Sequence, residues 1–333
     1  MNHNHLTRLC QYFNLGQSRQ APERIHGGLL HLMWRIDTDK GSYAIKQLSK
    51  DIDLTDERIV KNYELSEHIA RGFAAKNIPA LCAIAQFGNY LFMTEDTGYL
   101  VYPWVDAKSL DSQVVSKSHA LKIAAILAKM HQLNLDEPDL PPAHFYTYTQ
   151  EQIVALIDKT KQFDCPFSEN LWQNLDNILA ANEAYQKAMP ILKTHIIVTH
   201  GDLDQKNVLW DSDNNPILID WESACKINPT YDIINTAFYW SGITSDFDKA
   251  LFFKMIHTYQ QAGGVINKEH IVAAIGGVFS WIGWLVYNIN RSCVAGDSEQ
   301  KSMGITQVNE TLATILRLQI VMPEVINLIE VEL

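Results

Sequence analysis

The chain has 333 residues, of which 47% are hydrophobic and 20% are charged, so it can bury a full core and is expected to be globular. Its 38 acidic residues outnumber its 27 Lys and Arg, which gives a formal net charge of −11. This charge disfavours nucleic-acid binding and mildly favours cationic partners.

The cysteines and the apolar segments indicate in which cellular compartment the protein is expected. The five cysteines are scattered and form no Cys-x-x-Cys pair, which predicts reduced thiols rather than a disulfide framework or a zinc site. No signal peptide opens the chain, and the longest apolar stretch, Ile271 to Val286, is interrupted by Gly and Ser and is too short to cross a bilayer. We therefore expect a cytoplasmic protein without a membrane segment. His3 and His5 lack any partner motif and predict a frayed N-terminus, and nothing indicates an oligomeric state.

The first predicted elements are the strands of an antiparallel sheet. Residues 20–48 alternate between apolar and polar positions around turn residues, as two hairpins do. Gly27 and Gly28 interrupt the first hairpin, where a glycine pair lets the backbone approach a ligand closely but is more often a plain turn. Lys46 lies in the last of these strands, and a lone strand lysine is usually solvated. Whether Gly27, Gly28 and Lys46 contact a ligand therefore depends on the motifs that follow.

A helix and two further strands come next. Residues 56–76 have helical composition, with Glu64 and Glu67 three positions apart on one face. Strands are then predicted at 87–95 and 99–106. The second strand carries Tyr102 and Trp104, and aromatic residues in a strand more often belong to the core than to a ligand site.

The rest of the chain is predicted to be mostly helical from its apolar periodicity. The predicted helices cover residues 119–134, 251–263, 270–290 and 303–318. Trp281, Trp284 and Tyr287 recur at intervals of three along one of them. Such a stripe usually packs in the core, and the alternative is a partial aromatic wall that attracts an alkylammonium group through cation–π contact.

A catalytic loop is predicted near the middle of the chain. His195 to Thr199 is a short run of mainly apolar, β-branched residues that predicts a buried strand, so the loop that follows is held at a strand end. Residues 208–210 and 216–219 flank a cluster of turn residues and predict a hairpin. This hairpin would fold Asp220 back beside Asn207.

The side chains of this loop have the spacing that phosphoryl transfer from a nucleotide requires. Asp202 can orient an attacking hydroxyl and accept its proton. The amide of Asn207 and the carboxylate of Asp220 offer hard oxygen ligands to Mg²⁺, an ion that completes its coordination with water and phosphate oxygens. We expect these three residues to form a catalytic centre.

The loop and hairpin carry a family signature. His200-Gly201-Asp202 is followed by Asn207 at the spacing H-G-D-x-x-x-x-N, and Ile219-Asp220-Trp221-Glu222 then matches hydrophobic-D-[WY]-E. The sequence resembles the aminoglycoside phosphotransferase and choline kinase superfamily of kinase-like small-molecule kinases.

This resemblance implies an α+β, protein-kinase-like fold with two lobes. Residues 1–101 would form a nucleotide-binding lobe with an antiparallel sheet and one main helix. Residues 102–333 would form a mostly helical lobe for catalysis and acceptor binding. In such a fold Asp232, in a P-x-x-D element, supports the catalytic loop from below, and His131 packs under it.

The resemblance also assigns nucleotide contacts. Lys46 would grip the α- and β-phosphates, with Glu64 as the favoured helix carboxylate that aims it and Glu67 as the alternative. Gly27 and Gly28 would lie near the phosphates, and Tyr102 and Trp104 would flank the base in the strand that links the lobes.

One stretch departs from the family pattern. The family usually has Ser-Asn or a similar pair after its two glycines, whereas this chain has Leu29-Leu30-His31. Either the phosphate loop is looser here, or His31 takes over a polar role.

The predicted activity is ATP- and Mg²⁺-dependent transfer of the γ-phosphoryl group to a hydroxyl of a small molecule, with an amine-bearing acceptor favoured, such as an amino sugar or a choline-like alcohol. Asp204, two positions after the proposed base, is a candidate contact for an acceptor amine. Two alternatives remain open, a kinase acting on a protein partner and a nucleotide-binding regulator without turnover. A protein kinase is disfavoured because only twelve positions separate Asp220 from Asp232, which leaves no room for an activation segment.

Overall fold

The computed structural model of the protein describes residues 1–25, 31–95, 97–110, 116–294 and 298–332. The chain forms two compact units. The first comprises Met1–Asp111 and Lys206–Ala224, and the second comprises Ser112–Gln205 and Cys225–Leu333. The sequence predicts lobes at residues 1–101 and 102–333. The first unit of the structure also includes the segment Lys206–Ala224, because β6 (Ala107–Ser109) pairs with β8 (Val208–Asp211).

The first unit is built on a five-stranded sheet of antiparallel pairs in the order β1-β2-β3-β5-β4. Its strands are β1 (Glu23–Ile25), β2 (Leu32–Asp37), β3 (Ser42–Gln47), β4 (Phe92–Met93) and β5 (Gly98–Pro103). In the register of β3 and β5, Ile45 lies opposite Val101 and Lys46 lies opposite Leu100. Because successive side chains point to opposite faces, this register sends Ile45 to one face and Lys46 to the other.

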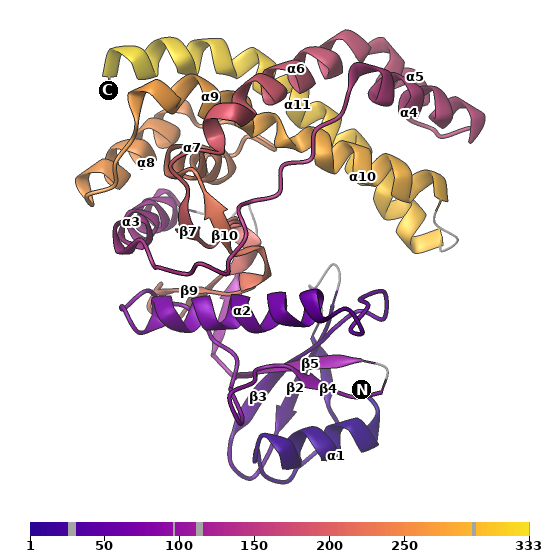
Figure 1. The fold of residues 1–333 in the computed structure, drawn as a ribbon, viewed down its shortest axis with the longest axis vertical. Helices are drawn as coiled ribbons and strands as arrows, with labels where there is room; N and C mark the ends of the chain where they lie inside the picture. The colour runs from indigo at the N-terminus through magenta and orange to yellow at the C-terminus, as the bar shows by residue number, and fades with distance from the viewer. Residues whose placement is uncertain (26–30, 96, 111–115, 295–297, 333) are drawn as a thin grey trace. The chain divides into compact units, whose positions relative to one another are not determined.

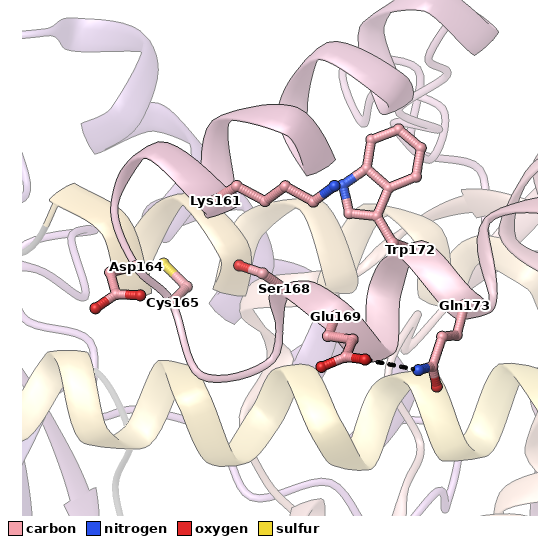
Figure 2. Close-up of a pocket in the computed structure, with 7 residues that line it drawn as sticks. All are labelled: Lys161, Asp164, Cys165, Ser168, Glu169, Trp172 and Gln173. Atoms are coloured by element: carbon pink, nitrogen blue, oxygen red, sulfur yellow. Dashed lines mark hydrogen bonds between the residues drawn. The ribbon is translucent and has the colours of Figure 1, made fainter.

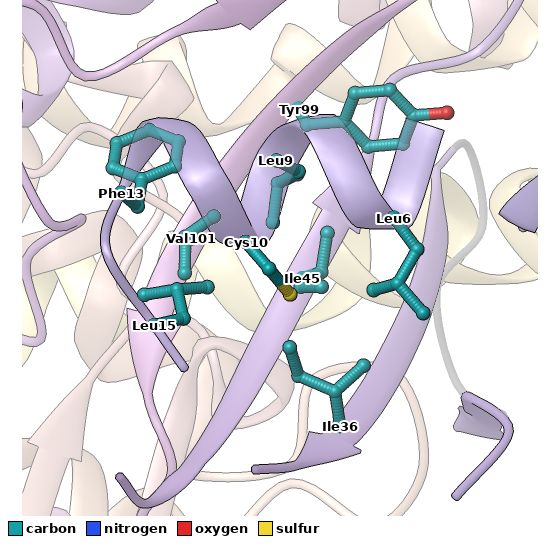
Figure 3. Packing of buried hydrophobic residues seen from close by; sticks show 9 residues of the cluster. All are labelled: Leu6, Leu9, Cys10, Phe13, Leu15, Ile36, Ile45, Tyr99 and Val101. Carbon is teal, nitrogen blue, oxygen red and sulfur yellow. The ribbon is translucent and has the colours of Figure 1, made fainter. Parts of the chain in front are cut away.

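The helix α1 (His3–Tyr12) covers one face of this sheet (Figure 3). Its buried residues Leu6, Leu9 and Cys10 recur at helical spacing and pack against strand residues that include Ile45 and Val101. The expectation of a frayed N-terminus was wrong, because this apolar face makes the segment part of the core.

The helix α2 (Glu57–Ala74) packs on the other face (Figure 1). It confirms the helix predicted at 56–76, and it begins where the Asp56 side chain accepts a hydrogen bond from the backbone N–H of Arg58 at 2.9 Å. Tyr63 from this helix joins Leu48 and Leu100 in a buried cluster. Lys46 therefore shares a face with α2.

The hairpin predicted between Asn207 and Asp220 is confirmed. Strand β8 pairs with β9 (Pro216–Leu218) in an antiparallel register, and the two form a three-stranded sheet with β6. The backbone N–H of Leu218 donates to the carbonyl of Pro79 at 2.7 Å, which ties the hairpin to the segment after α2. Trp221, just beyond the hairpin, is fully buried and stacks on Phe73 with ring centroids 5.5 Å apart.

The second unit is mostly helical, as predicted. Its helices are α3 (Lys117–Leu133), α4 (Gln150–Gln162), α5 (Ser168–Gln173), α6 (Leu175–Leu192), α7 (Pro229–Trp240), α8 (Lys249–Gln261), α9 (Ile271–Gly277), α10 (Trp281–Val294) and α11 (Ser298–Glu332). A short ladder of β7 (Ile197–Thr199) and β10 (Cys225–Ile227) brackets the catalytic segment.

Two segments of this unit, Lys268–Cys293 and Ser298–Leu328, are long and apolar enough to cross a membrane by length and composition alone. The expectation that the apolar stretch Ile271 to Val286 is too short to cross a bilayer was wrong by length and composition, because the apolar segment extends over 26 residues. Within the unit α10 packs on α11, and α9 packs on α6. Ile315 and Leu318 of α11 are fully buried, so part of the apolar surface of this helix packs within the unit.

The packing of α1 generates a stability prediction. Leu9 is fully buried against the sheet, so Leu9→Ala should lower the free energy of unfolding by about 2–5 kcal/mol through lost burial and a residual cavity. Urea titration followed by tryptophan fluorescence measures this change. Gln11→Ala, at an exposed position of the same helix, is the control and should change stability by less than about 0.5 kcal/mol. Equal effects of the two substitutions would contradict the packing described here.

Candidate active site

Asn207 and Asp220 are brought together by the hairpin. The backbone carbonyl of Asn207 accepts a hydrogen bond from the N–H of Ile219 at 3.0 Å, and Asp220 is the next residue. Asp220 has φ +64° and ψ +61°, a left-handed conformation that is uncommon for a non-glycine residue and that often marks a functional position. The donor set fits Mg²⁺, because it combines an amide with a carboxylate that remains 43% exposed.

Lys46 is buried and lies among carboxylates. Its Nζ donates to Oδ1 of Asp220 at 2.7 Å and also contacts Oε1 of Glu222. Burial opposes the charged amine, but the charges of Glu222 and Asp220 outweigh it and raise the pKa of Lys46 above its ordinary value. The ammonium is therefore retained at neutral pH and is available to an anionic ligand.

His31 holds the second of these carboxylates. The backbone N–H of Ser49 donates to Nδ1 of His31 at 3.2 Å, so Nδ1 is the acceptor and Nε2 carries the proton. Nε2 then donates to Oε2 of Glu222 at 3.0 Å. Burial opposes ionisation of Glu222, yet the hydrogen bond from His31 and the charge of Lys46 prevail and lower the pKa of Glu222 to about 2.

Glu64, the favoured partner of Lys46, is used elsewhere in the structure. Its carboxylate accepts from the backbone N–H groups of Tyr90 and Leu91 at 2.8 Å each, which fixes the loop before β4. The side chain therefore satisfies backbone donors instead of pairing with the lysine. This is a correction to the expected assignment.

Glu67, the alternative partner, is buried near Lys46. One oxygen accepts from the backbone N–H of Ala83 at 2.7 Å, and the other accepts from the hydroxyl of Tyr102. Burial raises the pKa of Glu67 to about 7, against the lowering effect of these bonds and of the Lys46 charge. A carboxyl that is half protonated near neutral pH is a weaker counter-charge than Glu222.

The two aromatic residues predicted beside the base have different surroundings. Tyr102 lies opposite Ala44 in the β3–β5 register and binds Glu67. The ring of Trp104 is covered by the guanidinium of Arg35 at 4.4 Å, and its Nε1 donates to Asp106 at 3.0 Å. Gly27 and Gly28 lie outside the described residues.

The loop that carries Asp202 belongs to the second unit, where α7 anchors it. Nε1 of Trp240 donates to the carbonyl of Leu203 at 2.9 Å, and the side-chain amide of Gln205 donates to the carbonyl of Tyr239 at 3.2 Å. Gly201 has φ +80°, a conformation that glycine adopts at low cost. Asp202 is partly exposed, and the segment that follows it is held against α7.

Asp232 supports this loop as predicted. Its Oδ2 accepts from the hydroxyl of Thr199 at 2.7 Å and hydrogen-bonds Nε2 of His131 at 3.1 Å. Thr199 is the last residue of β7, the strand that leads into the loop. His131 also hydrogen-bonds the hydroxyl of Tyr259 at 2.7 Å, so a buried network fixes the strand end.

The aromatic stripe of α10 divides in two. Trp284 stacks on Tyr287 with centroids 5.2 Å apart, and its Nε1 donates to Gln307 of α11 at 3.0 Å. Trp281 instead lies against Tyr239, with centroids 5.5 Å apart. Burial and the nearby charges of Asp202 and Asp204 raise the pKa of Tyr239 well above its ordinary value, so this aromatic pair adjoins the catalytic loop.

A cavity of about 580 Å³ in the second unit lies apart from these residues in the chain (Figure 2). It is lined by Lys161, Asp164, Cys165, Ser168, Glu169, Trp172 and Gln173. The ammonium of Lys161 lies over the ring of Trp172 at 4.2 Å, and Glu169 accepts from Gln173 at 3.1 Å. Cavity size alone therefore does not locate the chemistry of this protein.

The sequence did not predict the contacts of Glu222 with Lys46 and with His31. Glu222 was recognised only as part of a motif, and His31 only as a departure from one. A weak sequence signal exists for both residues. Glu222 follows the buried Trp221, and His31 directly precedes β2, so each is a polar residue beside a buried segment. Their pairing required the folded backbone.

The fold and this arrangement of residues define a kinase-like phosphotransferase. A family model described as a phosphotransferase enzyme family, APH, matches residues 22–264. The chain belongs to this family of small-molecule kinases. The comparison with curated proteins finds no match.

Solved structures show the same fold at low sequence identity. The spectinomycin phosphotransferase APH(9)-Ia, in complex with ADP and spectinomycin, superposes with a TM-score of 0.70 at 13% identity, covering 96% of this chain and 99% of that one. The choline kinase LicA from Streptococcus pneumoniae gives 0.60 at 16% identity, covering 95% and 99%. The amicoumacin kinase hAmiN, in complex with AMP-PNP and Ca²⁺, gives 0.66 at 12% identity, covering 93% of each chain. The expected kinase-like α+β fold is confirmed.

The raised pKa of Glu67 generates a prediction about stability. The folded protein holds this proton up to about pH 7, whereas the unfolded chain loses it near pH 4.5. Stability therefore falls as pH rises between these values, by about 3 kcal/mol in total. Glu67→Gln removes this ionisation, so the variant should gain stability relative to the wild type as pH rises from 4.5 to 7.

Urea titrations at several pH values measure this difference. Glu57→Gln, an exposed glutamate of the same helix, is the matched control and should follow the wild type. Parallel stability curves for Glu67→Gln and the wild type would show that Glu67 ionises normally.

Proposed function

We propose that this protein transfers the γ-phosphoryl group of ATP to a hydroxyl of a small, amine-bearing molecule. Lys46 grips the nucleotide phosphates, and Asn207 and Asp220 hold Mg²⁺. When bound, Mg²⁺ would neutralise negative charge on the phosphates. Asp202 orients the acceptor hydroxyl and takes its proton. Positioning and charge neutralisation account for most of the rate, because phosphoryl transfer asks little covalent chemistry of a protein.

The observation that carries the proposal is the buried Lys46 among acidic side chains. A lysine with a raised pKa, paired with the carboxylate of Asp220, is a site prepared for an anionic ligand with a divalent cation. A polyphosphate pairs with the ammonium of Lys46, and its bound divalent cation pairs with the carboxylate of Asp220. Neighbours in the fold support the nucleotide, since APH(9)-Ia binds ADP and hAmiN binds AMP-PNP.

The amine-bearing acceptor is supported by the surroundings of Asp202. After burial, the charges of Asp202 and Asp204 contribute to the raised pKa of Tyr239, and the ring of Tyr239 lies 5.5 Å from that of Trp281. Two carboxylates beside two aromatic rings suit a cationic amine, because the rings attract ammonium groups and the carboxylates pair with them. The solved neighbours include kinases named for choline and for the antibiotics spectinomycin and amicoumacin.

The alternatives have less support. A protein acceptor needs a docking segment after Asp220, and only twelve positions lead from there to Asp232. A regulator without turnover is disfavoured because Lys46, Asp202, Asn207 and Asp220 are all present. A cytoplasmic location is part of this proposal, because the five cysteines are scattered and form no Cys-x-x-Cys pair.

The first experiment tests the role of Asp202. Mg²⁺-dependent ATP consumption is measured against a panel of amino sugars, choline-like alcohols and other hydroxyl compounds. Asp202→Ala should reduce turnover with the active acceptor by roughly 10²- to 10⁴-fold while ADP affinity stays within about twofold, because the residue acts on the acceptor hydroxyl. Asp213→Ala, at the exposed tip of the hairpin, is the control. Normal turnover in Asp202→Ala would remove the proposed base.

A second experiment tests the amine-binding role of Trp281. Trp281→Leu should raise the KM of a cationic acceptor by roughly 3- to 30-fold while leaving the KM of ATP unchanged, because the lost contact is a cation–π interaction. Tyr287→Leu, at an exposed position on the same helix, provides the comparison. If both variants behave like the wild type, the aromatic pair does not contact the acceptor.

A further inference from the structure

The partner of the nucleotide lysine in this chain differs from the arrangement expected of the fold. A helix carboxylate was expected to aim Lys46, and α2 offers Glu64 and Glu67. Glu64 binds two backbone N–H groups, and Glu67 binds the backbone of Ala83 and the hydroxyl of Tyr102. Both helix carboxylates already have other hydrogen-bond donors.

Glu222 is placed to serve instead. One of its oxygens contacts Nζ of Lys46, and the other accepts from Nε2 of His31 at 3.0 Å. A carboxylate bonded through both oxygens to two different groups is fixed in direction, which is what a positioning residue requires.

His31 is fixed in turn. It is 8% exposed, and the backbone N–H of Ser49 sets its tautomer by donating to Nδ1. In this tautomer Nε2 carries the proton and faces Glu222, with the hydroxyl of Tyr63 3.5 Å away. The histidine that departs from the family pattern thus has a defined donor role.

We propose that Glu222, oriented by His31, is the carboxylate that aims Lys46 at the nucleotide phosphates, in place of a carboxylate from α2. The inference rests on the proposed function for the assignment of Lys46 as the phosphate-binding lysine. Glu222 and His31 are positioning residues, since they act through Lys46.

The test is a double-mutant cycle on ADP binding by calorimetry, in EDTA and again with Mg²⁺, with adenosine as the ligand that lacks phosphates. With Lys46 present, Glu222→Gln should change the Kd of ADP in EDTA by roughly threefold or more. In the Lys46→Met variant, the same substitution should change this Kd by less than about twofold. The Kd of adenosine should stay within about twofold throughout, since a positioning role concerns only the phosphates.

His31 completes the cycle. His31→Leu should reproduce the effect of Glu222→Gln, and His31→Gln should restore most of it, because the Gln side-chain amide places a donor near the position of Nε2. In the Glu222→Gln background, His31→Leu should add less than about twofold. Glu57→Gln is the matched control on an exposed glutamate of the same unit. If Glu222→Gln does not fold, Glu222→Asp, which keeps the charge on a shorter side chain, carries the same cycle.

Each other outcome overturns the proposal. Coupling of Lys46 to Glu67→Gln rather than to Glu222→Gln would return the role to α2. An effect of Glu222→Gln that appears only with Mg²⁺ and persists in Lys46→Met would make Glu222 a metal ligand. An equal loss of ADP and adenosine binding would make it structural. If Lys46→Met itself leaves ADP affinity unchanged, the lysine assignment in the proposed function fails as well, whereas an effect of Lys46→Met without coupling defeats this inference alone.

Discussion

The structure of the first unit depends on a lysine held inside the protein with its charge retained. Removing an ammonium group from water is costly, and Lys46 is 7% exposed. Asp220 and Glu222 offset this cost by pairing with it. Such an arrangement is a poor way to gain stability, since a buried ion pair often does no better than apolar packing. It does keep a positive charge at a fixed position, which is what the proposed binding of nucleotide phosphates at Lys46 requires.

The rest of this unit serves to bring these groups together. The β3–β5 register sends Lys46 to the face shared with α2, and α1 covers the opposite face with apolar side chains. The hairpin of β8 and β9 then returns the chain so that Asp220 and Glu222 reach that lysine from far along the sequence. The left-handed backbone at Asp220 is a local cost of this return.

In the second unit a loop is held in one position by hydrogen bonds, as Lys46 is held by carboxylates in the first. The segment directly after Asp202 is anchored, because the carbonyl of Leu203 accepts from Trp240 and the side chain of Gln205 donates to Tyr239 at the end of α7. The preceding strand is fixed by Asp232 through Thr199. A proton acceptor in phosphoryl transfer must meet one hydroxyl in one geometry, and a loop fixed in this way meets that requirement with little reorganisation.

The sequence by itself determined the family, the catalytic motif and the kinase-like fold, because H-G-D-x-x-x-x-N and the following D-W-E are local patterns whose spacing carries the chemistry. It also placed the hairpin and the helix that begins at Asp56, which depend on turn and capping residues close in the chain. Only the tertiary structure decided which carboxylate pairs with Lys46. The sequence alone does not show whether Glu64 or Glu222 pairs with Lys46. In the folded chain Glu64 binds backbone N–H groups and Glu222 binds His31, so Glu222 is the carboxylate left beside the lysine. The same reason explains α1, whose apolar face is a weak local pattern until the sheet supplies the surface that buries it.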